Sequence, residues 1–392
     1  MTMTRPLQGV RVLDLGTMIT APLAGMMLGD LGADVIKVER PEGDPFRSFR
    51  GGLYSPHFVA YNRSKRSVVL DLQKDKGRAA FRKLIATADV MLDNFRPGVL
   101  DRLGFGAEAL MAEFSKLICC SITGFGPNGP YRDRPAFDAV ASGLSGLYSV
   151  ILNPEQPRTS GPTIVDNIAG MYACHGILAA LFSRAMTGKG ARIETNMLEA
   201  AISFIPDPFA NEMLMGIHNT PRTRVATSQS FAFTCLDEQL IVIHLSSPVK
   251  FWEGLVKAIE RPDLLADPRF VSRDLRVKNF ELLEEELGKV FITRSREEWM
   301  RRLLAADIPF AQVQSLMDVV ADPQVKHLKT FYSMKHPTEG KVTGINLPIW
   351  VDGSREHDRL PPPALGEHSE DVLAACGYSA EDIETLRAEG VI

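Results

Sequence analysis

The chain has 392 residues, of which 45% are hydrophobic and 23% charged, which is ordinary for a globular protein long enough for two domains. Its formal net charge of -4 disfavours a nucleic-acid or membrane-surface binder, because such proteins concentrate Lys and Arg on one face. The sequence shows neither a signal-peptide pattern nor a run of about 20 residues free of charges and breakers. We therefore expect a cytoplasmic protein that binds no nucleic acid and no membrane.

Strand and helix patterns alternate through the first 120 residues. Apolar strands are predicted at 9–16, 33–40, 67–72, 89–95 and 116–126, and helices at 21–32, 76–88 and near 107–114. Strands that are apolar on both faces and separated by helices are typical of a parallel, doubly wound sheet. The turn after the first strand, "LGTMITAPLAG", lacks the G-x-G-x-x-G of dinucleotide-binding domains. We predict a Rossmann-like α/β domain that lacks the dinucleotide fingerprint.

The second half of the chain indicates a smaller domain. Predicted elements are a helix at 136–150, a helix from Asp166 to about 187, a strand at 192–197, a hairpin at 231–245 and amphipathic helices at 251–259 and 279–293. We expect a large α/β domain from 1–215 and 340–392, and a small α+β domain from 225–330. Residues 216–224 and 331–339 are predicted linkers, and the proline-rich arm at 359–377 leads into a terminal helix.

Asp166 opens the long apolar stretch "PTIVDNIAGMYACHGILAALF", and two roles are open for it. An Asp before an apolar helix is commonly an N-cap, whose carboxylate accepts bonds from the first free N–H groups. The positive end of a helix also keeps a carboxylate ionised, and an ionised carboxylate can attack an activated acyl carbon. His175, further along the same helix, is expected to be a hydrogen-bonded core residue.

The remaining residue patterns exclude several other kinds of site. No G-x-S-x-G elbow occurs, and neither the eight histidines nor the five cysteines have metal-ligand spacing, so we expect no metal site. Basic residues follow successive predicted strands, where open α/β sheets bind ligands, and their concentration indicates an anionic, phosphate-bearing ligand. These residues are Arg40, Arg47, Arg50, Lys65, Arg66, Arg96 and Arg102.

Several motifs resemble those of family III CoA-transferases, in colinear order over nearly the whole chain. They include "VRVLDLGTMITAPLAGMMLGDLGADVIKVERPEGDPFR" (10–47), "DNFRPGVLDRLGF" (93–105) and "VDNIAGMYACHGILAALFSRAMTGKGARIETNMLEA" (165–200). The resemblance implies an interlaced homodimer with no tightly bound cofactor, for which coenzyme A and acyl-CoA are substrates. It further implies that Asp166 is the catalytic carboxylate. The implied coenzyme A contacts are Arg40, Asn94, Phe95, Arg102 and Arg134.

The resemblance also implies the reaction: transfer of coenzyme A from an acyl-CoA to a carboxylic acid through an aspartyl-CoA thioester on Asp166. Oxalate-handling members have a glutamine where this chain has Ile19, and a glycine-rich flap that is missing between 217 and 253, which favours a larger or more apolar acyl group. Two alternatives remain. The related 2-methylacyl-CoA racemases place a histidine where this chain has Phe137, directly before Asp138. The other alternative is a non-catalytic CoA-binding protein.

Overall fold

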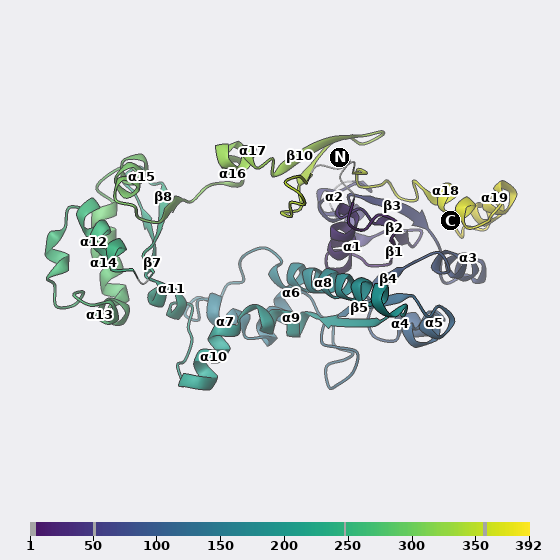
Figure 1. The fold of residues 1–392 in the computed structure, drawn as a ribbon, viewed down its shortest axis with the longest axis horizontal. Helices are drawn as coiled ribbons and strands as arrows, with labels where there is room; N and C mark the ends of the chain where they lie inside the picture. The colour runs from purple at the N-terminus through teal and green to yellow at the C-terminus, as the bar shows by residue number, and fades with distance from the viewer. Residues whose placement is uncertain (1–4, 50–51, 247, 356–358) are drawn as a thin grey trace. The chain divides into compact units, whose positions relative to one another are not determined.

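The computed structural model describes residues 5–49, 52–246, 248–355 and 359–392, and these group into two compact units (Figure 1). Unit 1 comprises residues 1–147, 159–206 and 326–392, and unit 2 comprises residues 148–158 and 207–325. Unit 1 is therefore discontinuous in sequence, because the chain leaves it to build most of unit 2 and then returns.

A six-stranded parallel sheet forms the centre of unit 1 within the described residues, in the order β3-β2-β1-β4-β5-β6. The strands are β1 (Arg11–Asp14), β2 (Asp34–Glu39), β3 (Lys65–Val69), β4 (Val90–Asp93), β5 (Ile118–Thr123) and β6 (Arg192–Asn196). The predicted parallel α/β sheet is confirmed. Strand order reverses between β1 and β4, the position at which doubly wound sheets open a crevice for ligands.

Helices cover both faces of this sheet. Those of unit 1 are α1 (Thr20–Asp30), η1 (Pro45–Ser48), α2 (Pro56–Tyr61), α3 (Asp75–Ile85), α4 (Val99–Arg102), α5 (Ala107–Glu113), α6 (Asp138–Leu144), α8 (Ile164–Thr187), α9 (Met197–Phe204), α18 (Ser369–Ala375) and α19 (Ala380–Ala388). Successive strand residues point to opposite faces, so Leu13 packs on one side into a core that includes Phe81 of α3 and Leu386 of α19. On the other side lie α1 and α8, which pack on each other, and α8 also packs on β5 and β6.

Helix α8 approaches the start of α1 so closely that only glycine fits at one position. A Cβ added at Gly170 would lie 2.5 Å from the Thr20 carbonyl oxygen, well inside van der Waals contact. Glycine therefore permits close backbone packing here. The position of α8 is consequently tied to the position of the β1–α1 turn.

The opposite face of α8 is exposed and apolar. Phe182 and Met186 are 73% and 76% exposed, and Met171 and Tyr172 extend the same surface toward the start of the helix. His175 is exposed as well, so the expectation of a core histidine is wrong: its position faces away from α1 and the sheet. Helix α8 has the length and composition of a membrane span, but its packing on α1, β5 and β6 is that of a core helix.

Unit 2 is an antiparallel sheet with helices packed on one face. Its sheet has the order β7-β8-β9, from β7 (Ser230–Thr234), β8 (Leu240–His244) and β9 (Phe310–Gln312), so the predicted hairpin is confirmed. The other elements are α7 (Leu147–Ile151), α10 (Pro206–Met215), α11 (Thr223–Ser228), α12 (Val249–Ala258), η2 (Pro262–Leu265), α13 (Arg273–Lys278), α14 (Phe280–Phe291), α15 (Arg296–Ala305), α16 (Leu316–Ala321) and α17 (Pro323–His327). Stacked Phe233 and Phe291 join the sheet to α14.

Two further segments differ from the sequence prediction. The helix predicted at 136–150 is broken into α6 and α7, because Gly146 adopts a φ of +84°, which a continuous right-handed helix does not allow. Residues 331–339, predicted as a linker, contain β10 (Phe331–His336), which pairs antiparallel with β11 (Gly340–Ile345).

Candidate active site

A pocket of about 310 Å³ lies within unit 1 where the strand order reverses. Its wall includes residues 17–20, from the turn after β1 and the first residue of α1, and residues 94–97 after β4. Residues 122–124, at the end of β5, also contribute. Asp166, near the start of α8, lines the same pocket. The carboxyl ends of neighbouring parallel strands thus meet the positive end of a long helix, an arrangement suited to an anionic ligand.

The first N–H groups of α8 are bound by Asp138. Its Oδ1 accepts the backbone N–H of Val165 at 2.7 Å and that of Asp166 at 3.1 Å. The residue at the N-cap position, Thr163, makes no side-chain cap bond. Asp138 is the first residue of α6, so a carboxylate from a neighbouring helix performs the capping that the sequence offered as one role for Asp166.

The Asp166 carboxylate itself is half-buried and has no hydrogen bond or ion pair to any residue that the structure describes. Burial disfavours the charged form, and the nearby Asp138 carboxylate adds repulsion, so the pKa of Asp166 rises to about 6. At neutral pH the group is still mainly ionised. An ionised, unpartnered carboxylate in a partly dry pocket is equipped to act as a nucleophile.

Asn94 and Phe95 follow β4 and have different surroundings. The Asn94 amide accepts the Thr17 N–H at 2.9 Å and donates to the Thr17 carbonyl at 2.8 Å and to the Thr20 hydroxyl at 2.9 Å. Its side chain therefore joins the β4 turn to the β1 turn. The Phe95 N–H donates to buried Asp93 at 3.0 Å, which fixes the backbone at the pocket edge.

A second pocket, of about 550 Å³, adjoins the first, since Thr17 and Phe95 line both. Arg40, at the end of β2, is exposed on this second pocket, and its Nε donates to the Gly43 carbonyl at 3.2 Å. Together the two pockets provide a path from Arg40 past Phe95 to Asp166. An extended ligand with an anionic end and a reactive end would fit such a path.

The other sequence candidates separate into two groups. Arg134 is exposed on the Asp166 pocket and stacks on Tyr131, with its guanidinium carbon 4.6 Å from the ring centre. Arg102, at the end of α4, is exposed but lines neither pocket. The structure thus brings Asp166, Asn94, Phe95 and Arg134 together, places Arg40 in the adjoining pocket, and leaves Arg102 outside both.

The basic residues that the sequence singled out do not form one anion site. Arg47 pairs with Glu39 and Lys65 with Asp14, and all four side chains are buried. Arg66 pairs with Asp34 on the sheet edge, and Arg50 lies outside the described residues. Arg96 lines the Asp166 pocket, as does Arg132, which the sequence did not single out.

Sequence reasoning missed the capping role of Asp138. The contact joins Asp138 to residues 27 and 28 positions later, and no local pattern indicates such a pairing. Phe137, directly before it, lines the pocket and is 61% exposed, and no histidine is among the described residues that line that pocket. Ile19 also lines it, packed with Phe46 and Phe58.

Within the described ranges, no group of three or more His, Cys, Asp or Glu side chains is placed to hold a metal ion. The five cysteines are free thiols, and burial raises the pKa of Cys174 on α8 to about 12. A thiol held so firmly in its neutral form is a packing residue.

Comparison with known proteins identifies relatives over almost the full chain. Residues 7–369 match the family model described as CoA-transferase family III. Succinyl-CoA:glutarate CoA-transferase of Mus musculus is 33% identical, with 99% of this chain and 90% of the relative aligned. Succinate–glutarate CoA-transferase of Agrobacterium fabrum is 31% identical, with 94% and 95% aligned.

Solved structures show the same relationship. A CAIB/BAIF family protein from Brucella suis superposes with a TM-score of 0.83 at 30% identity, covering 95% of this chain and 99% of the other. A protein from Mycobacterium tuberculosis in an orthorhombic crystal form gives a TM-score of 0.84 at 31% identity, with 94% and 99% covered. With its sheet, its family match and these relatives, the chain belongs to the family III CoA-transferases and is an enzyme of that class.

Proposed function

We propose that this CoA-transferase moves coenzyme A from an acyl-CoA to a free carboxylic acid through a covalent thioester on Asp166. One observation carries the proposal. The Asp166 carboxylate lines the pocket without a hydrogen bond or ion pair to the described residues, while Asp138 caps the helix on which it stands. Because Asp138 accepts the first N–H groups of the helix, the Asp166 carboxylate is not used for capping and is available for chemistry.

The reaction proceeds by two pairs of acyl exchanges. The Asp166 carboxylate attacks the donor thioester carbonyl, and the coenzyme A thiolate leaves, giving a mixed anhydride of Asp166 and the donor acid. The thiolate then attacks the aspartyl carbonyl, which releases the donor carboxylate and leaves aspartyl-CoA. The acceptor carboxylate attacks aspartyl-CoA, and the expelled thiolate attacks the acceptor acyl carbonyl. Acceptor acyl-CoA is formed and the Asp166 carboxylate is regenerated, with no net proton change.

The surrounding residues support this chemistry. Partial burial of Asp166 keeps water from hydrolysing the anhydride and the thioester, which would waste the energy of the thioester bond. The positive end of α8 stabilises the negative charge that develops on the aspartyl carbonyl oxygen. Coenzyme A would extend from Arg40 through the pocket shared by Thr17 and Phe95, with its sulfur near Asp166.

The pocket favours a substrate acid with a second carboxylate. Arg96, Arg132 and Arg134 are exposed on the wall that Asp166 shares, and guanidinium groups bind carboxylates with matching geometry. The names of several relatives specify succinyl-CoA as a reactant. Succinyl-CoA with a dicarboxylic acceptor is accordingly the first pair to test, and glutarate against pentanoate would isolate the contribution of the second carboxylate.

The residue at position 137 disfavours racemase chemistry. Racemisation needs one group to remove the α-proton and another to return it on the opposite face. Phe137 can do neither, although it stands on the pocket wall directly before Asp138. A single 2-methylacyl-CoA enantiomer in heavy water should therefore keep its α-hydrogen in the presence of this enzyme.

The decisive experiment traps the covalent intermediate. Incubation with an acyl-CoA donor followed by borohydride should reduce the activated Asp166 side chain, and mass spectrometry should find the modification on its peptide. Asp166→Asn should abolish both trapping and transfer, because an amide cannot form the anhydride. Asp207→Asn is the matched control, an acidic residue in the first turn of α10, and should leave both intact.

Two results would contradict the proposal. Transfer at more than a trace by Asp166→Asn would remove the assigned nucleophile. Rapid α-deuteration of the 2-methylacyl-CoA, without movement of coenzyme A to any acid tested, would favour the racemase instead.

We also infer that the enzyme is an interlaced homodimer in the cytoplasm. Support for the dimer comes from the outer face of α8, where Met171, Tyr172, Phe182 and Met186 are exposed together. Contiguous apolar surface of this kind usually marks an interaction site, and a second copy of the chain is the occupant that the family resemblance implies. Free cysteines are compatible with a reducing compartment.

A further inference from the structure

The turn after β1 is held by side chains from outside the turn. The Gly16 N–H donates to Asp14 Oδ1 at 2.9 Å, and the Gly16 carbonyl accepts from Lys37 Nζ at 2.7 Å. Asn94 binds both the N–H and the carbonyl of Thr17. A turn of this length would ordinarily satisfy such groups with water or with its own backbone. Here each group is fixed by a residue of the sheet or of the neighbouring turn.

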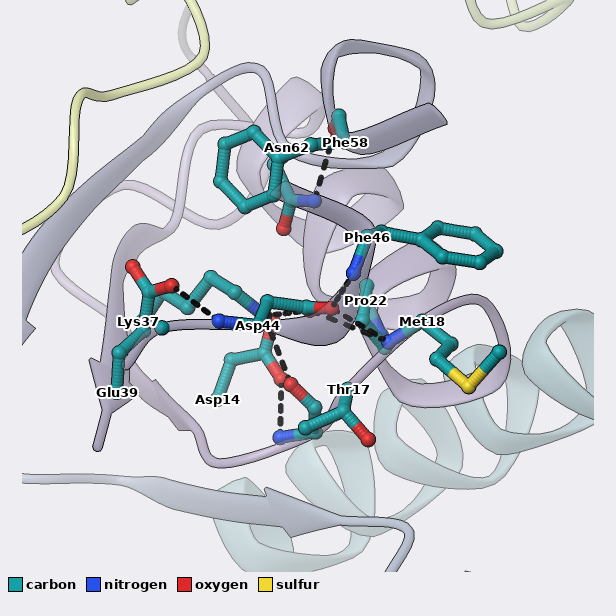
Figure 2. Close-up of polar contacts among 12 residues, drawn as sticks. Asp14, Thr17, Met18, Pro22, Lys37, Glu39, Asp44, Phe46, Phe58 and Asn62 are labelled. Carbon is teal, nitrogen blue, oxygen red and sulfur yellow. Dashed lines mark hydrogen bonds and ion pairs between the residues drawn. The ribbon is translucent and has the colours of Figure 1, made fainter. Parts of the chain in front are cut away.

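Asp44 completes this set at Met18. Both of its carboxylate oxygens lie 3.1 Å from the Met18 N–H, and one of them also accepts the Phe46 N–H at 2.9 Å (Figure 2). Met18 has a φ of +63°, a left-handed conformation that costs a non-glycine residue about 1 kcal/mol or more. The Asp44 carboxylate therefore binds the turn at the residue whose backbone is strained.

Lys37 and Asp44 form a buried ion pair beneath the turn. Lys37 Nζ lies 2.9 Å from Asp44 Oδ2, and neither side chain has any exposed surface. Burial alone would lower the pKa of Lys37, but Asp44, Asp14 and Glu39 together raise it, so the ammonium persists. Burial likewise opposes ionisation of Asp44, yet Lys37 and the backbone N–H groups hold its pKa below the usual value.

A buried ion pair is weak evidence for stability, since apolar residues of similar size often serve as well. Its placement suggests a different purpose. Residues 17–20 line the Asp166 pocket, and Thr17 also lines the adjoining one. The Thr20 carbonyl is in close contact with Gly170 of α8, the helix that carries Asp166. Movement of the turn would thus change both the pocket wall and the position of α8, which carries Asp166.

We propose that Lys37 and Asp44 are positioning residues for the transfer reaction, a buried ion pair that fixes the strained turn at Met18 opposite Asp166. This inference rests on the proposed role of Asp166. Both residues line the adjoining pocket, but their side chains have no exposed surface and neither touches the reacting atoms. Lys37 acts through the Gly16 carbonyl and Asp44 through the Met18 N–H.

The test replaces the pair by apolar residues of similar size, Lys37→Met with Asp44→Leu, so that no buried charge is left unpaired. Hydrogen exchange of the peptide that contains residues 16–19 reports on the turn directly, without any need for activity. Steady-state kinetics with acyl-CoA separate kcat from KM. The matched control is Arg184→Met with Asp89→Asn, a partly buried ion pair between the last turn of α8 and the residue before β4, outside both pocket linings.

The double variant is expected to exchange the 16–19 amides at least tenfold faster and to lose kcat by about 10- to 100-fold, because small misplacements around a reacting group have effects of that size. Its KM for acyl-CoA should stay within about threefold of the wild-type value. The control should match wild type in both measurements. Asp44→Asn, which keeps an oxygen for the Met18 N–H, should retain most of the kcat that the double variant loses.

Wild-type exchange at residues 16–19, or a KM increase with unchanged kcat, would overturn the proposal. If the double variant does not fold, Asp44→Ala provides the test of the turn, because it removes the acceptor of the Met18 N–H while Lys37 keeps its bond to the Gly16 carbonyl. Failure of the proposed function would look different. In that case the wild-type enzyme itself would give no trapped Asp166, while the exchange measurement would still report whether the pair holds the turn.

Discussion

The sequence left two roles open for Asp166, capping and chemistry, and in the structure a second carboxylate performs the capping. Asp138 accepts the N–H groups of Val165 and Asp166, and its negative charge also raises the pKa of Asp166. The capping residue thus contributes to the protonation behaviour of its neighbour. A more basic carboxylate stays ionised at neutral pH and remains ready for attack, but it becomes protonated at a higher pH than an exposed aspartate.

This arrangement predicts an unusual acid limb in the pH profile. In the proposed mechanism only ionised Asp166 attacks, so kcat/KM should fall as the pH drops through about 6, the pKa of this residue, instead of near the ordinary 3.8. Asp138→Asn keeps an oxygen for the cap but removes the repelling charge, so the limb should move to lower pH. Steady-state kinetics between about pH 4.5 and 8 measure the acid limb of the wild type and of the variant.

Glu113→Gln on α5 is the control, an exposed carboxylate whose removal should leave the limb in place. An acid limb that stays at the same pH in Asp138→Asn would show that the Asp138 charge does not act on Asp166, the proposed nucleophile.

The sequence predicted the position of Asp166 but not its surroundings. Its place at the head of an apolar helix follows from hydrophobic periodicity, which is a local property of the chain. The contact with Asp138 closes a loop of more than twenty residues and depends on how α6 lies beside α8, which no local pattern specifies. The basic residues show the same limit, because only the fold separates Arg47, paired with Glu39, from Arg96 on the pocket wall.

At the scale of the elements, α8 meets α1 through a glycine. Gly170 has no room for a side chain next to the Thr20 carbonyl. In the sequence Gly170 is one of many glycines and carries no distinguishing mark. The break between α6 and α7 at Gly146 was equally hidden, since a glycine inside a helical pattern is often tolerated. The close contact at Gly170 depends on how two helices pack, and the break at Gly146 depends on its backbone conformation. The spacing of apolar residues in the sequence reports neither.

Gly170→Ala should therefore destabilise the protein by about 1–3 kcal/mol, the usual cost of forcing atoms into a filled space. Urea unfolding followed by circular dichroism measures the change. Gly288→Ala on α14 is the matched helical control, because the nearest atom to an added Cβ lies 3.9 Å away. That variant should be neutral or up to about 1 kcal/mol more stable, since alanine favours helix more than glycine does. A Gly170→Ala protein as stable as wild type would contradict the close packing.

At the scale of the whole molecule, the parallel sheet was the most predictable feature. Strands apolar on both faces, alternating with helices, specify this class of fold without further information. The antiparallel hairpin of β7 and β8 was predictable from two apolar runs separated by a short polar turn. The pairing of β10 with β11 was not, since it joins a segment predicted as a linker to the tail. The apolar outer face of α8 is also a property of the assembled molecule, because the helix is apolar nearly all round in sequence.

Phe182→Glu on that face should weaken the proposed dimer by placing a charge at its centre. Light scattering at micromolar concentration should give twice the 43.2 kDa chain mass for wild type and a lower average for the variant. Leu316→Glu on α16 is the control, a leucine that is 86% exposed, and it should not change the mass. A wild-type protein with the mass of one chain would refute the dimer.

The discontinuity of unit 1 has a consequence for synthesis of the chain on the ribosome. The core on one face of the sheet includes Phe81 and Leu84 from early in the chain, packed with Val372 and Leu386 from its last part. At roughly 5–20 residues per second, the early strands would wait on the order of 15–60 s for those partners. Residues 207–325 emerge in that interval and can fold first. A nascent chain stalled before residue 369 would present an open apolar sheet, the kind of surface that chaperones and proteases recognise.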